Sequence, residues 1–296
     1  MEKLIQTVIL GLLLGGVYAL MASGLSLIFG VMHVINVAHG AFLVLSALLT
    51  WELWKTTGID PLVAAVITTP VMFVLGYLIY RFLLQRLRNS SPSMTVLLTF
   101  GMALVIEGGM GLVTRNIFRS VTPSYFNASF NLGPFFLPKP QVYGFIAAIL
   151  VMGLLYLALT HTWPGRAIRA SSQNMSSAQL IGISASSVAA LTFAVGAATT
   201  GVGGSILSVL FAFFPASHYI WISRLLGIIV LGGMGSLPGA IVGAIILGIA
   251  ETMTATYISL RWATVVFYIV IMAVLLIRPQ GLFGTRLRED VAAVPA

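Results

Sequence analysis

Long apolar runs make up most of this sequence, and they limit the chain to a membrane protein more strongly than any other feature. The first run, from Leu4 to Phe29, contains no charged residue and exceeds the roughly 20 residues that a helix needs to cross a ~30 Å apolar core. Charged residues make up 7% of the chain, against about 25% in soluble domains. So few charges cannot form a water-facing surface, which excludes a soluble globular protein, a disordered chain and an ordinary nucleic-acid-binding protein.

Nine apolar segments predict helices, because backbone amides inside lipid must be paired internally and a barrel would need short alternating strands. A signal peptide would have a shorter apolar region of about 7–15 residues, so the first run is expected to be a retained helix. We expect one all-α polytopic domain spanning residues 1–296, with about 8–10 transmembrane helices and broken or short helices near 30–40 and 225–238. The segments are Leu4–Phe29, Val37–Trp54, Pro61–Leu84, Met94–Val113, Gln141–Thr160, Ser187–Phe214, the short Leu225–Gly233, Ala240–Thr256 and Trp262–Ile277.

The net charge of +8 comes from Lys and Arg residues that lie almost entirely between these runs. Cytoplasmic loops of membrane proteins carry such an excess of positive charge, so the charge indicates orientation and not nucleic-acid binding. We expect residues 161–186 and the tail 278–296 on the cytoplasmic side, and residues 114–140 and the N-terminus outside. The basic residues that define the cytoplasmic side are Arg81, Arg86, Arg88, Arg166, Arg169, Arg278, Arg286 and Arg288.

Signatures of catalysis and of metal binding are missing. The chain has no cysteine, none of its three lysines lies in a Gly-rich loop, and no two of its four histidines are four residues apart. A Walker A loop needs a lysine after its glycines, and zinc sites on helices use paired histidines. We therefore expect no enzyme activity, no metal site and no cofactor of the chain's own.

Two carboxylates, Glu107 and Glu251, lie in apolar surroundings. A charge at the membrane centre costs at least about 2.5–3.5 kcal/mol, so each needs a polar cavity or an ion pair. The alternatives are a place near a helix end or a protonated carboxyl group.

Polar residues also separate the first two apolar runs. His33, Asn36 and His39 are spaced three apart, and a broken helix here would expose backbone groups to a cavity, as in transporters; a plain polar turn is the alternative. Asn36, His39 and Gly40 are the candidates for this lining. Many glycines, such as the Gly239 and Gly243 pair, are expected to permit close helix packing. The sequence alone does not establish an inverted repeat.

The loop after residue 160 combines a basic start with a short amphipathic pattern. Met175, Ala178, Ile181 and Gly182 fit one face of a short helix. Such a helix could bind a partner protein or could lie on lipid.

Short motifs occur along the chain at Ile35–Ala41, Gly165–Ala170, Leu180–Ile183, Leu231–Ala240, Gly248–Glu251 and Arg278–Gly284. At these motifs the chain resembles permease subunits of the high-affinity branched-chain amino acid ABC importers, over nearly its whole length. The sequence departs from the family pattern at Val37, Ala41 and Asn174, where an aromatic, an acid and an Asp are usual. These departures weaken any assignment of the transported solute, since relatives carry urea, amides or other small polar molecules.

The resemblance implies a permease that forms part of a translocation path in the bacterial cytoplasmic membrane. It implies a second permease subunit, two separate ATPase subunits that bind ATP, and a periplasmic solute-binding protein. Arg166, Arg169, Ala178 and Gly182 would contact an ATPase. The path would include Asn36, His39, Gly40, Glu107, Gly232, Gly233, Gly235 and Glu251.

A stand-alone secondary transporter or channel for a small polar solute remains the main alternative, with Glu107 and Glu251 as ion-coupling groups. A membrane-embedded enzyme is disfavoured by the missing catalytic signatures.

Overall fold

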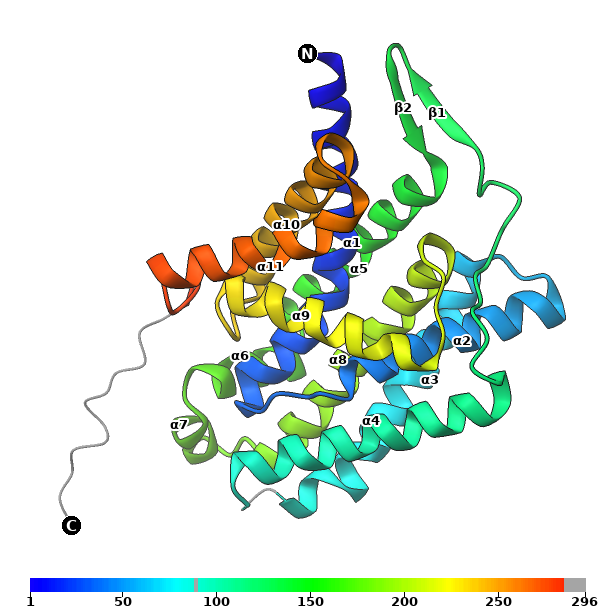
Figure 1. The fold of residues 1–296 in the computed structure, drawn as a ribbon. Coiled ribbons are helices and arrows are strands. Elements are labelled where there is room, and N and C mark those ends of the chain that lie inside the picture. The colour runs from blue at the N-terminus through cyan, green and yellow to red at the C-terminus, as the bar shows by residue number, and fades with distance from the viewer. Residues whose placement is uncertain (88–89, 285–296) are drawn as a thin grey trace.

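The computed structural model describes residues 1–87 and 90–284, and it is almost entirely helical (Figure 1). This confirms the all-α polytopic class. The helices are α1 (Glu2–Met32), α2 (His39–Thr57), α3 (Pro61–Phe82), η1 (Leu84–Leu87), α4 (Pro92–Thr114), α5 (Lys139–His161), α6 (Trp163–Gln173), α7 (Met175–Leu180), α8 (Ala185–Leu210), η2 (Pro215–Ser217), α9 (His218–Gly232), α10 (Leu237–Tyr257) and α11 (Leu260–Ile277). Strands β1 (Ser129–Leu132) and β2 (Phe135–Pro138) form an antiparallel hairpin.

Within the described residues, seven helices are long and apolar enough to cross a membrane: α1, α3 with η1, α4, α5, α8, α10 and α11. The other two expected segments form α2 and α9, which have 19 and 15 residues. Helix α9 is shorter than a full crossing, and α2 carries His39, Glu52 and Lys55. The nine apolar segments of the sequence therefore divide into seven full-length helices and two shorter or more polar ones.

Each of the sets α1–α4 and α8–α11 has four α-helices, and the second helix of each set, α2 or α9, is its shortest. Helix α1 packs antiparallel to α10, since Gly11 meets Ile249 while Gly15 meets Ile245. Helix α3 packs in the same way against α8, where Gly201 meets Thr69. Helices α1 and α8 are also antiparallel neighbours, so the two sets run in opposite directions. This is the arrangement of an inverted-topology repeat.

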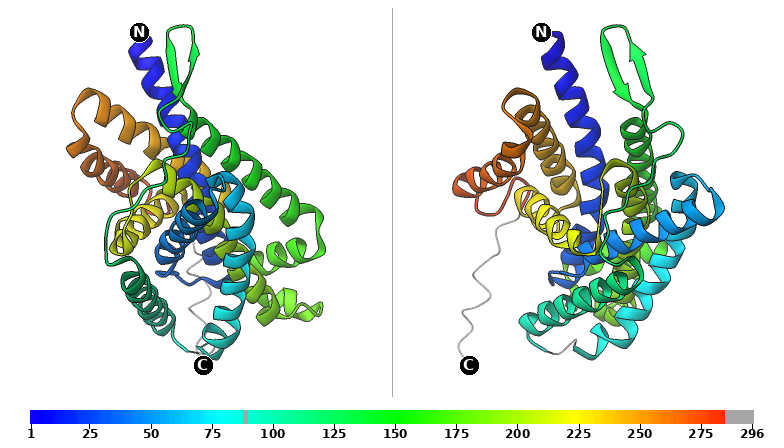
Figure 2. Two further views of the ribbon diagram at one scale, coloured as in Figure 1. Left: turned by 90° about the vertical axis from the view of Figure 1, so that its right-hand side faces the viewer. Right: turned by 45° about the vertical axis from the view of Figure 1, so that its right-hand side comes forward.

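The β1–β2 hairpin marks one end of the bundle. It projects beside the N-terminal end of α1 in every view (Figures 1 and 2), and Gln6 Nε2 donates a hydrogen bond to the backbone oxygen of Phe136. Tyr125 donates to Asp60 over 3.3 Å, which holds the connection before the hairpin against the turn between α2 and α3. Burial and the adjacent Asp60 raise the pKa of Tyr125 above its usual value of 10.0, so its hydroxyl remains a donor at neutral pH.

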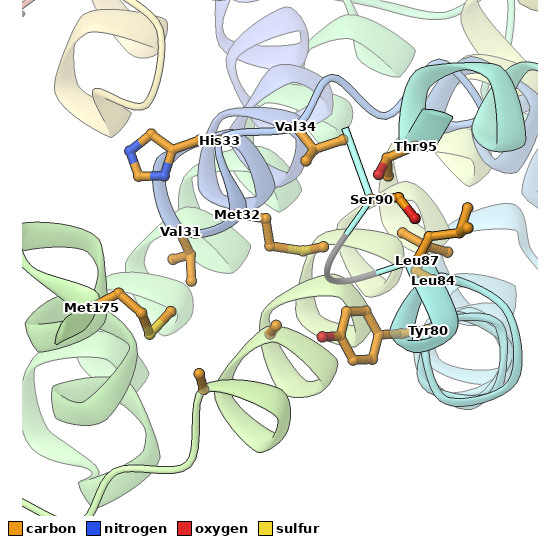
Figure 3. A pocket seen from close by; sticks show the side chains of 12 residues that line it. Val31, Met32, His33, Val34, Tyr80, Leu84, Leu87, Ser90, Thr95 and Met175 are labelled. Carbon is orange, nitrogen blue, oxygen red and sulfur yellow. The ribbon is translucent and has the colours of Figure 1, made fainter. Parts of the chain in front are cut away.

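Helices α6 and α7 lie at the opposite end (Figure 1). Leu87 of η1 and Met175 of α7 border one cavity together with Val31 near the end of α1 (Figure 3). The backbone N–H of Leu282 donates to the oxygen of Leu231, beside the turn after α9, whose Gly235 meets Gly30 near the same end of α1. The segments that contain Arg81, Arg166 and Arg278 therefore share one end of the bundle, as the predicted orientation requires. Arg88, Arg286 and Arg288 lie outside the described residues.

We expect Gly248→Val to destabilise the protein, because a Cβ at Gly248 would lie 2.6 Å from the backbone Cα and N of Gly15. Overpacking of this kind costs about 1–3 kcal/mol. The measurement is the melting temperature of the purified protein in detergent. Gly153→Val is the control, because nothing lies within 4 Å of a Cβ at Gly153. Equal melting temperatures for the two variants would contradict this account of the α1–α10 contact.

Candidate translocation site

The break between α1 and α2 is held by a turn and by a threonine from α4. His33 ends α1 in a left-handed conformation (φ 54), and its N–H donates to the oxygen of Phe29. Within the break, the N–H of Val37 donates to Thr99 Oγ1 over 3.2 Å. Because Thr99 supplies this acceptor, the irregular backbone is bound to protein and not exposed to lipid.

Side chains at the break point into the protein. Asn36 is 1% exposed and His39 is fully buried. His39 Nε2 lies 3.2 Å from the oxygen of Met21, whereas no described group pairs with His39 Nδ1 or with either polar atom of the Asn36 side chain. An unpaired buried polar group costs about 1–3 kcal/mol, so these atoms favour a state in which a polar partner reaches them.

A second break, between α8 and α9, meets the first. Helix α9 begins at His218, and a Cβ at Gly40 would lie 2.6 Å from the oxygen of His218. Helices α2 and α9 therefore contact each other at their N-terminal ends, where backbone N–H groups carry partial positive charge. Gly40 is required here because any larger residue would separate the two ends.

Glu107 lies at this junction. Its Oε2 is 3.0 Å from Nε2 of His218, which joins α4 to the start of α9. The Glu107 side chain is 24% exposed and that of His218 is 1% exposed. The structure thus brings together Asn36, His39, Gly40 and Glu107, and it adds His218, which the sequence analysis did not select.

Glu251 belongs to a different cluster. Its carboxylate pairs with Arg224 of α9 over 2.9 Å and accepts a hydrogen bond from Tyr18 of α1 over 2.9 Å. The Arg224 guanidinium also lies 5.6 Å from the ring centre of Trp221 and 5.7 Å from that of Phe267. The sequence analysis did not select Arg224. It is the one Lys or Arg residue in the stretch that forms α9, and a lone cation in an apolar helix inside the membrane needs an anion as its partner.

Gly232 is the last residue of α9, at the end opposite His218, and Gly233 and Gly235 lie in the turn between α9 and α10. Gly233 and Gly235 have φ values of 102 and 83, which other residues rarely adopt. Gly232 packs against the backbone of Gly239. Backbone geometry and close packing account for these glycines, which lie apart from the cluster around Glu107.

The segment after α5 forms two short helices where the pattern predicted one. Asn174 ends α6 and caps α7, accepting a hydrogen bond from the N–H of Ser177. Ala178 is 3% exposed and faces the bundle, while Leu180 and Ile181 are 89% and 75% exposed. Arg166, Arg169 and Gly182 are exposed as well, so the surface that a partner can reach has apolar side chains beside basic ones. Gly182 adopts φ 85.

We expect the ion pair between Arg224 and Glu251 to behave as a coupled unit. Glu251→Leu leaves the buried Arg224 guanidinium unpaired, a change that costs about 3–5 kcal/mol. Arg224→Leu leaves the Glu251 carboxylate unpaired instead. The double replacement should lose less stability than the sum of the two single replacements. Melting temperatures of the three variants in detergent measure this coupling. Strict additivity would show that the two side chains do not stabilise each other.

The sequence matches a family described as "Branched-chain amino acid transport system / permease component" over residues 7–275. The chain is 31% identical to the high-affinity branched-chain amino acid transport system permease protein LivH of Escherichia coli K12, with 95% of both chains covered. It is 28% identical to BraD of Pseudomonas aeruginosa, again with 95% of both chains covered. It is also 29% identical to a probable LivH of Methanocaldococcus jannaschii, over 90% of this chain and 88% of the relative.

No solved structure gives a significant match. The family match covers both halves of the inverted repeat and both helix breaks, and seven helices of the described chain are able to span a membrane. The chain therefore belongs to the family of branched-chain amino acid transport permeases and is a multi-pass membrane protein.

Proposed function

We propose that this chain is the permease subunit of an ATP-binding-cassette importer that moves branched-chain or other small amino acids across the bacterial cytoplasmic membrane. The proposal rests on the family match over residues 7–275. This range includes nearly all of the helical bundle, from α1 to α11. A second permease subunit completes the path, two separate ATPase subunits bind ATP, and a periplasmic solute-binding protein delivers the amino acid.

The ATPase contact is assigned to α6, α7 and Gly182. Large apolar side chains that stay exposed outside the membrane mark an interaction surface, and Leu180, Ile181 and Trp163 are such residues. Arg166 and Arg169 supply positive charge beside them, while Ala178 anchors α7 to the bundle. The orientation inferred from the basic loops supports a cytoplasmic position for this surface.

The path is assigned to the junction of α2 and α9. Asn36 and His39 offer unpaired polar atoms there, Gly40 permits the contact between the helices, and Glu107 is partly accessible. Gly232, Gly233 and Gly235 let α9 end and turn sharply. Glu251 holds α9 to α1 and α10 through Arg224.

Uptake of radiolabelled L-leucine into proteoliposomes tests the proposal. We expect uptake only when the second permease, the ATPases, ATP and the binding protein are all present. The alternative, a secondary transporter, predicts uptake by this chain alone under an ion gradient. That result would overturn the assignment to an ATP-driven importer.

We expect Ile181→Asp to prevent the ATPase subunits from co-purifying with the permease and to lower ATP-driven uptake at least tenfold. The substitution puts a charge into a contact that would otherwise bury an apolar side chain. Phe130→Asp, in the hairpin at the other end of the bundle, is the control and should leave ATPase binding unchanged. Full ATPase binding by the Ile181 variant would show that α7 is not part of the ATPase contact.

Replacement of Asn36 by Leu is expected to lower the rate of uptake at least tenfold while ATPase binding remains normal. Leu is similar in size but cannot exchange hydrogen bonds with a passing solute. Uptake at the native rate would count against the path assignment, and unchanged ATPase co-purification verifies that the variant is folded.

A further inference from the structure

The β1–β2 hairpin lies outside the apolar core of the membrane. Helix α1 has 31 residues, which is about 46 Å at ~1.5 Å per residue and exceeds an apolar core of ~30 Å. The hairpin projects beside the N-terminal end of this long helix (Figures 1 and 2). An open two-stranded sheet also leaves edge backbone groups without strand partners, which lipid does not tolerate. On the predicted orientation, the hairpin faces the outside of the cell.

One face of this hairpin is entirely apolar. The strand register pairs Leu132 with Phe135. It also pairs Phe130 with Leu137, and because successive side chains of a strand point to opposite faces, all four lie on one face. Phe130 and Leu132 are 37% and 60% exposed. A two-stranded hairpin is marginally stable by itself, and apolar side chains exposed outside the membrane mark an interaction surface.

Positive charge gathers at the same end of the bundle, against the usual pattern. Residues 114–140 contain three basic residues and no acidic residue, although loops on the outer side are normally poor in Lys and Arg. Membrane orientation does not require this excess, whereas an acidic partner would be attracted by it. The basic residues of this end are Lys3, Lys55, Arg115, Arg119, Lys139 and Arg261, against the acidic residues Glu2, Glu52 and Asp60.

Aromatic rings hold three of these cations in place. The Arg119 guanidinium lies 3.8 Å from the ring centre of Trp51, and Lys55 Nζ lies 4.9 Å from the same ring centre. Lys139 Nζ lies 5.2 Å from the ring centre of Phe130. Both ion pairs in the described part of the chain involve α9 instead, so none of the three cations has a carboxylate partner there. Aromatic residues and Arg are enriched at protein interfaces, and here they lie beside the apolar hairpin face.

We propose that the apolar hairpin face and the cations around Trp51 form the docking surface for the solute-binding protein, whose matching face combines carboxylates with an apolar centre. The inference rests on the proposed function, which requires a soluble partner on this side of the membrane. Arg119 and Phe213 exchange backbone hydrogen bonds, and Phe213 lies shortly before α9, while Trp51 belongs to α2. Docking at this surface therefore contacts the segments that carry both short helices of the path junction.

Binding of the leucine-loaded solute-binding protein to the complete importer in lipid nanodiscs tests the surface. Lys55→Glu, Lys139→Glu and Leu132→Asp should each raise the dissociation constant at least tenfold. The first two place like charges against carboxylates, and the third places a charge in an apolar contact. Co-purification of the ATPase subunits and of the second permease verifies that each variant is folded.

Arg261→Glu is the matched control, because it makes the same charge change at the same end of the bundle, in the first turn of α11. At about 0.15 M salt, exposed charges further apart than ~8 Å are largely screened. The control should therefore alter the dissociation constant less than twofold. A tenfold effect of Arg261→Glu as well would show that the attraction is general and would overturn the assignment to this surface.

Ionic strength separates a charge contact from a structural effect of the substitutions. The association rate of the native complex should fall as salt is added, because attraction between exposed charges is screened. Lys55→Gln should weaken this salt dependence, and Arg261→Gln should leave it unchanged. The native salt dependence in the Lys55→Gln variant would contradict a contact between Lys55 and an acidic partner.

Native affinity in all three surface variants would overturn the docking surface and leave the proposed function intact. If the second permease or anionic lipid were lost from these variants instead, that occupant would cover the surface and the inference would be wrong. Failure of the native complex to bind the solute-binding protein would reject the proposed function together with the surface.

Discussion

Close contact between helix backbones is the constraint on which this fold depends. Inside lipid the hydrophobic effect gives no preference for helix association, so small residues that let backbones approach supply much of the packing. Gly15 lies against Gly248, Gly24 against Gly196, and Gly232 against Gly239. These contacts join α1 to α10, α1 to α8, and α9 to α10, and they place α1 and α8 at the centre of the bundle.

Central placement of α1 and α8 makes the helix breaks possible. Irregular backbone at membrane depth persists only where protein covers it. The break after α1 is covered by Thr99 of α4, and the break after α8 pairs with the connection that follows α4, where Arg119 and Phe213 exchange backbone hydrogen bonds. Short helices α2 and α9 therefore begin inside a protein environment, and their polar first turns cost less there than they would in lipid.

The helices themselves were predictable from sequence, because an apolar run of about 20 residues is a strong local signal. Met94–Val113 was expected and α4 spans Pro92–Thr114; the expected break at 30–36 lies at 33–38. The partner of Glu251 was not predictable in the same way, since Arg224 is on another helix and the pairing depends on how α9 packs against α10. The short helix expected around Met175 and Ala178 forms as α7, whereas α6, which ends at its C-cap Asn174, was not predicted as a helix.

The inverted repeat could not be predicted from the sequence. Equivalent helices such as α3 and α10 have the same role in packing but share no visible motif, since any small residue in the right place permits a close approach. The glycines of Gly232–Gly235 illustrate the same limit, because a glycine that allows a turn and one that lines a path are identical in the sequence. Only the contacts with Gly239 and Gly30 separate the two interpretations.

Helix α9 is held by two polar contacts of different kinds, and this difference follows from their burial. Arg224 has a carboxylate, a hydroxyl group and aromatic rings around it, and both members of its ion pair are 12% exposed. Breaking that pair leaves a charge with no water to replace the partner. His218 is buried, but Glu107 is partly open and can exchange its imidazole partner for water or for a solute at smaller cost. We therefore expect contacts to change at the start of α9, next to Asn36 and Gly40, while Arg224 keeps the helix in place.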